Sequence, residues 1–590
     1  MAAPRIIVIG GGLAGLSAVI KIAEAGGSVD LFSIVPVKRS HSVCAQGGIN
    51  AAKNLKGEGD TTYKHFDDTI YGGDFLANQT PVKLMCEAAP AIIDLLDRMG
   101  VPFNRTPEGL LDFRRFGGTL YNRTAFAGAT TGQQLLYALD EQVRRYESEG
   151  KVKKYEGWEF LSAVIDSKGV ARGITALDLR TMELRSFTSN AVILATGGNG
   201  SIFGKSTNSV VCTGSAQSAV FQQGVYYANG EFIQVHPTCI PGEDKLRLMS
   251  ESARGEGGRV WVPRTAGDKR LGKQIPEAER FYFLEEWYPK YGNLVPRDIA
   301  TRAIHKVVYE DHLGIGGQPM VYLDLTHIDR ATLDRKLGGI LDIYEKFVGD
   351  DPHDVPMKIF PGVHYTMGGV WVDFNQMTNI PGIFAIGECE YQYHGANRLG
   401  ANSLLSCIYA GFISGPNALN YAKNAVAQEG DGGHAAELVR QAEINSKLLK
   451  NEGSENPFKL WRELGETMTK HATVIRYNKG LKQADEKIVE LLERYKNVCL
   501  ADRSQWANTS FAFARQLKNM LELARVIVQG AALRDESRGA HYKPDFPERD
   551  DERFLKTTKA SFTESGPRFE YEEVDTQFIK PRPRRYDAAN

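Results

Sequence analysis

Residues 5–33 read RIIVIGGGLAGLSAVIKIAEAGGSVDLFS, and this stretch decides the fold. The apolar run after Arg5 predicts a strand, and the glycines that follow predict a tight turn into a helix. A glycine pair then ends the helix before a second apolar strand. Gly10, Gly12 and Gly15 supply the G-x-G-x-x-G spacing that lets backbone N–H groups approach a pyrophosphate at a helix N-terminus. We therefore predict a dinucleotide-binding α/β unit at the start of the chain.

Two later strands end in a similar way. NAVILATGGNG ends a strand at residues 195–198, and GIFAIGECE ends another at Gly387 and Glu388. Carboxylates and N–H groups at the carboxyl ends of parallel strands are placed to contact an extended ligand. The acidic residue that usually holds a ribose after the second strand is replaced by Ser33. Three such strand ends favour a dinucleotide bound along its whole length, and FAD fits this pattern better than NAD.

The composition is that of an ordinary globular protein, with 590 residues, 42% hydrophobic and 24% charged. A formal net charge of −1 excludes an overall basic field for nucleic acid or an anionic membrane. Seven cysteines without a C-x-x-C pair argue for a reducing compartment and against a metal or iron–sulfur site held by this chain alone. Without a long apolar run or signal-peptide pattern, we expect a cytosolic protein unless partner subunits dock it to a membrane.

The length predicts three to five structural units, at roughly 150 residues each. We predict an α/β fold in which a discontinuous Rossmann-like FAD-binding domain carries an inserted capping domain, followed by a helical domain and a C-terminal extension. Within the first part, residues 63–149 are expected to be helical, with turns at YGGDF and NRTPEG. The predicted boundaries are 1–231 and 353–432 for the FAD-binding domain, 232–352 for the capping domain, 433–540 for the helical domain and 541–590 for the extension.

Glycine-rich segments in and after the insertion carry the residues suited to a small dicarboxylate. Its anionic ends need cationic or N–H donors, and chemistry beside a flavin needs a group that exchanges a proton. A single histidine or arginine in such a loop more often has a structural role, but several of them in glycine-rich loops beside a nucleotide-binding unit favour a dicarboxylate-binding site. The candidates are His236, Ser250, Glu251, Arg254, Arg297, His364 and Arg398.

RSHSVCAQGGIN, at residues 39–50, follows the second strand and can reach the middle of an extended dinucleotide. A neutral imidazole at His41 could attack the dimethylbenzene edge of a flavin, and the thiolate of Cys44 is a rival nucleophile. Both side chains could also merely line the loop. If Asn402 begins a helix, the N–H groups of Ser403 and Leu404 can face an anionic reduced flavin; the alternative is an ordinary helix cap.

Taken in order, these motifs resemble the flavoprotein subunits of succinate dehydrogenase and fumarate reductase, in a superfamily that includes L-aspartate oxidase. The resemblance covers nearly the whole chain, through GGGLAGLSA, RSHSVCAQGGIN, FAGATTGQQLL, HPT, ESARGEGG, PRDIATR, HYTMGG, GEC, HGANRLGANSLL and ESRGAHYKPDFPERDD. The sequence around RSHSVCAQGGIN is most similar to that of bacterial succinate dehydrogenases of the menaquinone type.

The resemblance implies a role for each matching residue. His41 would bear FAD covalently through the 8α-methyl group, and Arg297 would exchange the substrate proton with Glu251 and Arg254 as its relay. The dicarboxylate would be bound by His236, Ser250, His364 and Arg398, with Phe126 beside it. The residues implied to bind the cofactor are Gly10, Gly12, Leu13, Ala14, Gly15, Ser33, Ser40, His41, Ser42, Gln46, Gly47, Gly48, Ala195, Thr196, Gly197, Gly198, Glu388, Arg398, Ser403 and Leu404.

The resemblance also implies the activity: succinate is oxidised to fumarate, and electrons pass through FAD to an iron–sulfur subunit and then to quinone, with menaquinone expected. A haem-bearing membrane anchor would hold the complex at the cytoplasmic face of the bacterial cell membrane. The alternatives are fumarate reduction, a soluble L-aspartate oxidase, which lacks the flavin-linking histidine, and a catalytically inactive flavoprotein. Ser215 departs from the acidic residue common in relatives, and Arg114 and Arg115 have no assigned role.

Overall fold

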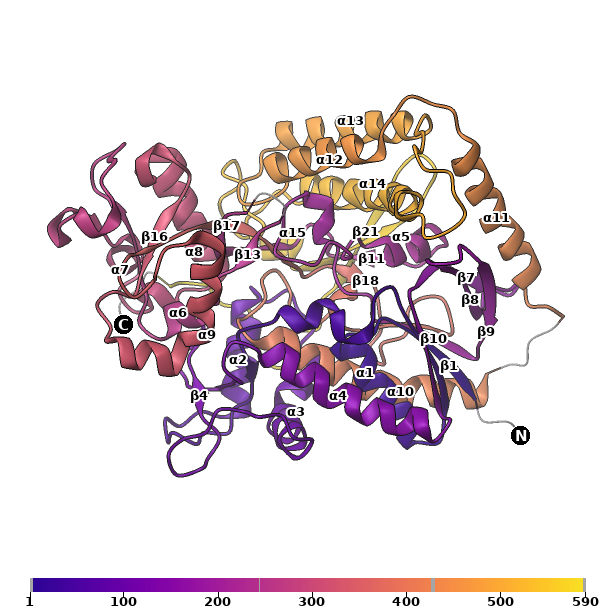
Figure 1. The fold of residues 1–590 in the computed structure, drawn as a ribbon, viewed down its shortest axis with the longest axis horizontal. Helices are drawn as coiled ribbons and strands as arrows, with labels where there is room; N and C mark the ends of the chain where they lie inside the picture. The colour runs from indigo at the N-terminus through magenta and orange to yellow at the C-terminus, as the bar shows by residue number, and fades with distance from the viewer. Residues whose placement is uncertain (1–3, 243–244, 426–429, 587–590) are drawn as a thin grey trace.

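A parallel five-stranded sheet lies at the centre of the N-terminal part of the computed structural model, which describes residues 4–242, 245–425 and 430–586 (Figure 1). The strand order is β19-β10-β1-β2-β6. The strands are β1 (Arg5–Ile9), β2 (Ser28–Ser33), β6 (Val152–Glu156), β10 (Ala191–Leu194) and β19 (Ile383–Ala385). Strand β10 lies between β1 and β19 and pairs with both in parallel. This order brings together the three strands whose ends were predicted to contact the cofactor.

Two closely packed helices cover one face of this sheet. Helix α1 (Leu13–Glu24) follows β1, and α10 (Asn402–Asn424) begins at the residue where a helix start was expected. Glycines let the helix backbones approach, since a Cβ at Gly411 would lie 2.6 Å from the carbonyl oxygen of Ala14. The apolar side chains of α1 are buried almost throughout, as a helix between a sheet and a second helix requires.

The opposite face is covered by an antiparallel three-stranded sheet. It contains β7 (Trp158–Ile165), β8 (Ala171–Asp178) and β9 (Leu184–Thr188). A second apolar cluster, which includes Phe32, Trp158 and Val192, fills the space between the two sheets. The short strands expected after residue 155 are therefore present, and they enclose the central sheet from its second face.

The prediction that residues 63–149 are helical is only partly right. Helices α2 (Thr62–Gly72), α3 (Gln79–Arg98) and α4 (Thr131–Ser148) form, but residues 99–130 do not form a helix. Glycines with positive φ interrupt this segment at positions 100, 109, 118 and 128, where other residues would be strained. The segment instead supplies β4 (Phe113–Arg114) and β5 (Thr124–Ala125), which pair with β3 (Ile49–Asn50).

A second unit, at the left of Figure 1, is built on a six-stranded sheet with its own apolar core. Its helices are α6 (Ser252–Gly255), α7 (Phe283–Trp287), α8 (Arg297–His305) and α9 (Arg330–Val348), and its strands are β12 (Ile233–Ile240), β13 (Arg247–Leu248), β14 (Arg259–Pro263), β15 (Arg280–Phe281), β16 (Val321–Asp324) and β17 (Met357–Thr366). Strand β17 pairs with β12 and β16 although it follows residue 352. The predicted domain boundaries stay predictions.

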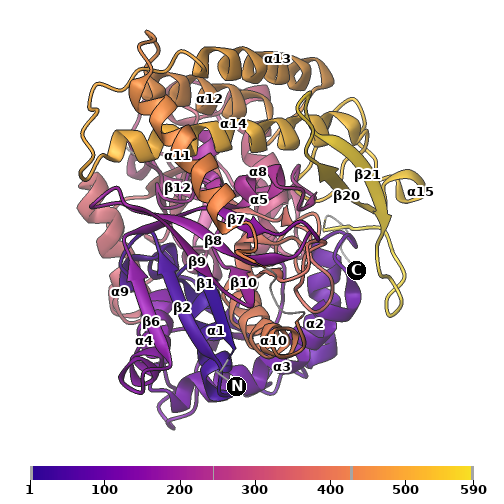
Figure 2. The same cartoon turned by 90° about the vertical axis from the view of Figure 1, so that its right-hand side faces the viewer.

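The C-terminal part adds a helical layer and a β-hairpin. Helices α11 (His434–Lys450), α12 (Pro457–His471), α13 (Asn478–Tyr495) and α14 (Thr509–Leu533) carry a separate apolar core, and α15 (Asp551–Phe554) is a single turn. The hairpin is formed by β20 (Lys556–Ser561) and β21 (Arg568–Glu573), at the right of Figure 2. Its strand β20 pairs with β11 (Tyr227–Ala228), which also pairs with β18 (Gly369–Val370). In the part of the chain that the structure describes, no helix could span a bilayer.

Candidate functional site

A cavity of about 530 Å³ opens at the carboxyl ends of β1, β10 and β19. Residues from all three strand ends line it, including Gly10, Thr196 and Glu388. The lining continues past His41 to Arg297 of α8, so one cavity joins the central sheet to the second unit. An extended ligand at the sheet would therefore end against the side chains of the inserted segment.

The glycine turn after β1 has no room for larger residues at two of its positions. Gly10 has a φ of +114°, and a Cβ there would lie 2.1 Å from the carbonyl oxygen of Ala195. A Cβ at Gly15 would lie 1.9 Å from the carbonyl oxygen of Gly10. These contacts explain the G-x-G-x-x-G pattern: the turn, the helix start and the neighbouring strand end touch through their backbones.

Several polar groups around this end of the cavity have no protein partner. The hydroxyl of Thr196 and the side-chain oxygen of Gln46 are buried without a hydrogen bond in the described structure. Burial raises the pKa of Glu388 to about 7, although the N–H of Thr366 donates to its carboxylate. Orphan donors and acceptors beside a glycine turn fit the hydroxyl and ring groups of a flavin dinucleotide, because buried polar groups are rarely left unpaired.

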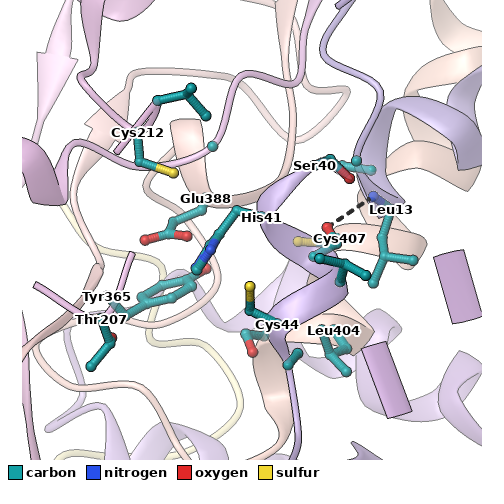
Figure 3. Close-up of a pocket in the computed structure, with 18 of the residues that line it drawn as sticks. Leu13, Ser40, His41, Cys44, Thr207, Cys212, Tyr365, Glu388, Leu404 and Cys407 are labelled. Carbon is teal, nitrogen blue, oxygen red and sulfur yellow. Dashed lines mark hydrogen bonds between the residues drawn. The ribbon is translucent and has the colours of Figure 1, made fainter. Parts of the chain in front are cut away.

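The segment between β2 and β3 places His41 on the cavity wall. A short 3-10 helix, His41–Cys44, carries the histidine and the cysteine, and the imidazole points toward Tyr365 and Glu388 (Figure 3). The hydroxyl of Ser42 accepts a hydrogen bond from the N–H of Leu13 at 3.2 Å, which ties this segment to the start of α1. His41 and Cys44 both line the cavity, as the sequence predicted for a segment that reaches the middle of a dinucleotide.

Two histidines face each other at the far end. His236 of β12 and His364 of β17 have ring centroids 5.0 Å apart. The N–H of Thr238 donates to Nδ1 of His236 at 3.1 Å, so the proton of the neutral ring is on Nε2, which is buried without a partner. Burial and the nearby charge of Arg297 hold the pKa of both histidines well below the usual range. Both rings are therefore neutral, and Nε2 of His236 is a donor that requires an acceptor.

A buried ion-pair chain lies beside the histidines. Arg297 donates from Nη2 and Nε to one carboxylate oxygen of Glu251, at 2.7 and 2.9 Å. Arg254 donates from Nη2 to the other oxygen of Glu251 at 2.9 Å. Burial opposes ionisation of Glu251, but the charges of Arg297 and Arg254 lower its pKa. Glu251 is therefore a carboxylate shared by two guanidinium groups.

The charges at this end of the cavity do not cancel. Arg254, Arg297 and Arg398 are all buried; Glu251 faces all three, and Glu388, whose pKa of about 7 leaves it partly protonated at neutral pH, faces Arg398. Burial and the repulsion of Arg297 lower the pKa of Arg398 only to about 9, so it stays protonated at neutral pH. The three guanidinium groups therefore carry more positive charge than the two carboxyl groups offset, which favours an anionic ligand such as a dicarboxylate.

Most of the predicted site residues meet in this one cavity. Arg254, Phe126, Gly15 and Gly198 do not line it in the described structure, although Arg254 bonds to Glu251, and a Cβ at Gly198 would reach Glu388. The predicted residues that line the cavity are Gly10, Gly12, Leu13, Ala14, Ser33, Ser40, His41, Ser42, Gln46, Gly47, Gly48, Ala195, Thr196, Gly197, His236, Ser250, Glu251, Arg297, His364, Glu388, Arg398, Ser403 and Leu404.

Gln234 is a site residue that the sequence analysis missed. Its amide oxygen accepts from Nη1 of Arg297 at 2.9 Å, and its amide nitrogen donates to the carbonyl oxygen of Arg398 at 2.8 Å. It therefore connects two of the buried arginines. Its position two residues before His236 in a strand was the available signal, because alternate residues of a strand share a face.

The three residues without an assigned role have distinct surroundings. Arg114 is buried, donates to the carbonyl oxygen of Gly47 and lies over the ring of Phe126, 4.0 Å from its centroid. Arg115 pairs with Glu58 near the surface. Ser215 lines the cavity, and its hydroxyl accepts a hydrogen bond from Asn519 at 2.8 Å.

Comparison with known proteins agrees with this geometry. The family model described as "FAD binding domain" matches residues 5–404, and the model "Fumarate reductase flavoprotein C-term" matches residues 461–586. The chain is 62% identical to the succinate dehydrogenase flavoprotein subunit of Bacillus subtilis, over 99% of both chains. The chain belongs to the succinate dehydrogenase and fumarate reductase flavoprotein family.

Other members of this flavoprotein family are more distant in sequence but similar in fold. The fumarate reductase flavoprotein subunit of Haemophilus influenzae is 36% identical, over 99% of this chain and 96% of its own length. A quinol fumarate reductase structure from E. coli matches with a TM-score of 0.92 at 32% identity, covering 100% of this chain and 99% of that one. The predicted α/β fold and the predicted family are confirmed.

Proposed function

We propose that this chain oxidises succinate to fumarate as the flavoprotein subunit of a succinate dehydrogenase. The observation that carries the proposal is the excess of buried positive charge at one end of a cavity whose other end is a glycine turn suited to a flavin dinucleotide. A dianion is bound where the charges match, and its carbon atoms lie between the basic residues and the cofactor site. The 62% identical relative from Bacillus subtilis has the same named activity.

Each binding residue has a role that follows from its protonation state. Arg398 and the neutral imidazole of His364 would hold one carboxylate, and Nε2–H of His236 with the hydroxyl of Ser250 would hold the other. Orphan donors such as Nε of Arg398 and Nε2 of His236 would gain acceptors when the dicarboxylate binds. Phe126, packed under Arg114, would support the cavity from behind.

Oxidation removes a hydride and a proton from neighbouring carbon atoms of succinate. FAD supplies the hydride acceptor at N5 when it is bound. Arg297 would exchange the proton: its guanidinium group would pass one N–H proton to the carboxylate of Glu251 as it accepts the proton of the substrate, because it is the cavity-lining arginine that is bonded to Glu251. From Glu251 the proton can then pass on to Arg254 through the hydrogen bond already formed. Gln234 keeps Nη1 of Arg297 occupied and so leaves the other guanidinium nitrogens for the transfer.

We further propose that FAD is attached covalently through His41. One ring nitrogen of His41 would bond the 8α carbon of the flavin. The proton lost by the imidazole and one hydrogen of the 8α-methyl group would stay on the flavin, which would then be reduced by two electrons. Fumarate would return the flavin to the oxidised state. The support is the position of His41 on the cavity wall and its burial, which with the charge of Lys245 lowers its pKa to about 4 and leaves it neutral and nucleophilic.

The attachment is tested by flavin fluorescence of the denatured protein. Wild-type chain should retain fluorescence, His41→Ala should lose it, and Cys44→Ala should keep it. Loss of flavin from denatured wild-type protein would refute covalent attachment, and loss in Cys44→Ala alone would move the attachment to the thiol.

The direction of the reaction and the partners complete the proposal. Electrons would pass to an iron–sulfur subunit, then to menaquinone in a haem-bearing anchor at the cytoplasmic face of the membrane. Fumarate reduction is the alternative, because the relatives from Haemophilus influenzae and E. coli that are named fumarate reductase are 36% and 34% identical to this chain over 96% and 95% of their own lengths. Anaerobic titration of the holoenzyme with succinate tests the chemistry: bleaching of the flavin is expected, and bleaching by aspartate alone would revive an L-aspartate oxidase. Steady-state rates with quinone and with quinol would decide the direction.

A further inference from the structure

One short loop bonds to two of the cavity histidines. Thr207, Asn208 and Ser209 lie between a 3-10 helix at Gly200–Phe203 and helix α5 (Ser215–Gln222). The hydroxyl of Thr207 lies 2.6 Å from Nδ1 of His364. The amide nitrogen of Asn208 lies 3.1 Å from Nε2 of His41 and also donates to the carbonyl oxygen of His364 at 3.2 Å. None of these three loop residues was singled out by the sequence.

The loop controls the protonation state of His41. The backbone N–H of Ser209 points at Nδ1 of His41 at 3.2 Å, and the Asn208 amide nitrogen points at Nε2. The Ser209 N–H belongs to the backbone and keeps Nδ1 as an acceptor, so an imidazolium would place an N–H against it and the neutral ring carries its proton on Nε2. Nε2 must give up this proton when it bonds carbon. The amide nitrogen of Asn208 is a donor as it is oriented, so it favours the deprotonated form of Nε2 that bonds carbon.

The same loop fixes the ring of His364. The Thr207 hydroxyl lies 2.6 Å from Nδ1 of His364 and 3.4 Å from the carbonyl oxygen of Val363, and the short contact leaves Nε2 of His364 to face the cavity. If the hydroxyl donates to Nδ1 rather than to Val363, Nε2 carries the proton of the neutral ring and is a donor to a carboxylate. His364 then presents the same kind of group as His236, whose Nδ1 is fixed by Thr238.

The packing around the loop makes it rigid. Thr207 and Asn208 are buried, the N–H of Thr207 donates to the carbonyl oxygen of Val363, and Ser206 forms a bridge with the same strand. Gly200 makes room for the amide, because a Cβ there would lie 2.0 Å from Oδ1 of Asn208. Val210, two residues further on, is 68% exposed. The buried, hydrogen-bonded part of the loop is thus the part that contacts the histidines.

We propose that Asn208 and Thr207 are positioning residues: Asn208 holds His41 ready for flavin attachment, and Thr207 orients His364 toward the dicarboxylate. The inference rests on the proposed function, since it assumes a tethered flavin and a dicarboxylate ligand. It adds a physical link between the two, because one rigid loop sets both ring orientations.

The first experiment tests flavin attachment and compares the flavin content of full-length variants. Asn208→Ala and the isosteric Asn208→Asp should lower the covalent fraction, measured as fluorescence of the denatured chain, by about tenfold, as loss of one hydrogen bond of about 1.4 kcal/mol predicts. Total FAD, released and covalent together, should stay near the wild-type value. Val210→Ala, at the exposed position of the same loop, should match wild type. Asn208→Asp keeps the test open if Asn208→Ala does not fold.

The second experiment tests ligand binding with variants of Thr207. Thr207→Val, which keeps the shape and removes the hydroxyl, should weaken fumarate binding about tenfold in a titration of the flavin absorbance. It should leave the covalent fraction unchanged, and Thr207→Ser should restore the affinity. A merely structural role would move both readouts together and would not be rescued by serine.

The outcomes separate the two proposals. Wild-type chain without covalent flavin would refute the tether itself, whatever the variants do. Covalent wild-type chain with an unchanged covalent fraction in both Asn208 variants would overturn the role of Asn208. Wild-type fumarate affinity in Thr207→Val would overturn the role of Thr207.

Discussion

Arg297 and Glu251 are joined by two hydrogen bonds to a single carboxylate oxygen, and both side chains are buried. The second oxygen of Glu251 belongs to Arg254. A carboxylate shared in this way holds both guanidinium groups in place and offsets part of their charge inside the protein. Removing it would leave two buried cations without a partner, which is far more costly than losing an exposed ion pair.

Glu251→Gln should lower the turnover number at least about hundredfold, because the proton path loses its acceptor and a hundredfold change corresponds to about 2.7 kcal/mol of activation free energy. The neutral amide can keep the shape of the side chain but cannot accept a proton from Arg297. Steady-state kinetics of succinate oxidation measure the effect. Glu277→Gln, in an exposed pair with Arg259, is the matched control and should behave as wild type. Unchanged turnover in Glu251→Gln would remove this residue from the proton path.

Gln234→Leu should reduce kcat/KM about tenfold to hundredfold, because the change removes a hydrogen bond to charged Arg297 and another to the backbone of Arg398. The shape of the side chain is kept, so the loss reports on orientation rather than on volume. Gln223→Leu is a suitable control: that amide bonds both backbone groups of Ala163, away from the cavity. The control should lower thermal stability without changing kcat/KM. A similar kinetic loss in both variants would indicate a general effect on packing.

The sequence predicted the cofactor end of the site more completely than the rest. Gly10 and Glu388 belong to motifs whose spacing reflects a fixed backbone geometry, so their place at strand ends could be read in advance. Gln234 and Thr207 could not, because their roles depend on which side chains the folded chain brings opposite them. Arg114 and Arg115 are identical in type, but Arg114, the last residue of β4, points inward to Gly47, and Arg115, just after the strand, points outward to Glu58.

The helix expected across residues 99–130 failed for a related reason. Its glycines and prolines were recognised only as local turns, whereas the segment pairs with β3, far away in sequence. Helical periodicity on either side of such a segment carries no information about a long-range partner. The same limit applies to β17, whose place in the sheet depends on β12.

Gly10→Ala should abolish cofactor binding, because the added Cβ would meet the backbone of Ala195 at 2.1 Å and the φ of +114° disfavours alanine. Gly26→Ala separates these two effects. Gly26 also has a positive φ, of +84°, but nothing lies within 4 Å of its added Cβ. The control should lose about 1 kcal/mol of stability and keep its flavin. The flavin-to-protein absorbance ratio and thermal melting measure both outcomes; full flavin content in Gly10→Ala would contradict the geometry of the turn.

Glu390→Gln should change how stability depends on pH. Burial raises the pKa of Glu390 to about 8, so the folded state binds its proton more tightly than the unfolded state does. The stabilisation that this proton gives is complete below about pH 4.5 and is lost as the pH rises through 8. The melting temperature of the variant relative to wild type should thus be higher at pH 9 than at pH 5. Glu493→Gln, an exposed substitution, should show no such trend.

The residues that line the cavity run from Ile9 to Cys407, and the hairpin that pairs with β11 comes later still. During synthesis, the glycine turn leaves the ribosome first. The elements that complete its side of the cavity, β19 and α10, are made several hundred residues later. The nascent chain therefore has half of a binding site for most of its translation. Flavin capture belongs to the end of synthesis or after it, and a chain that stops before β19 has an open sheet edge at β10 and no way to close the cavity.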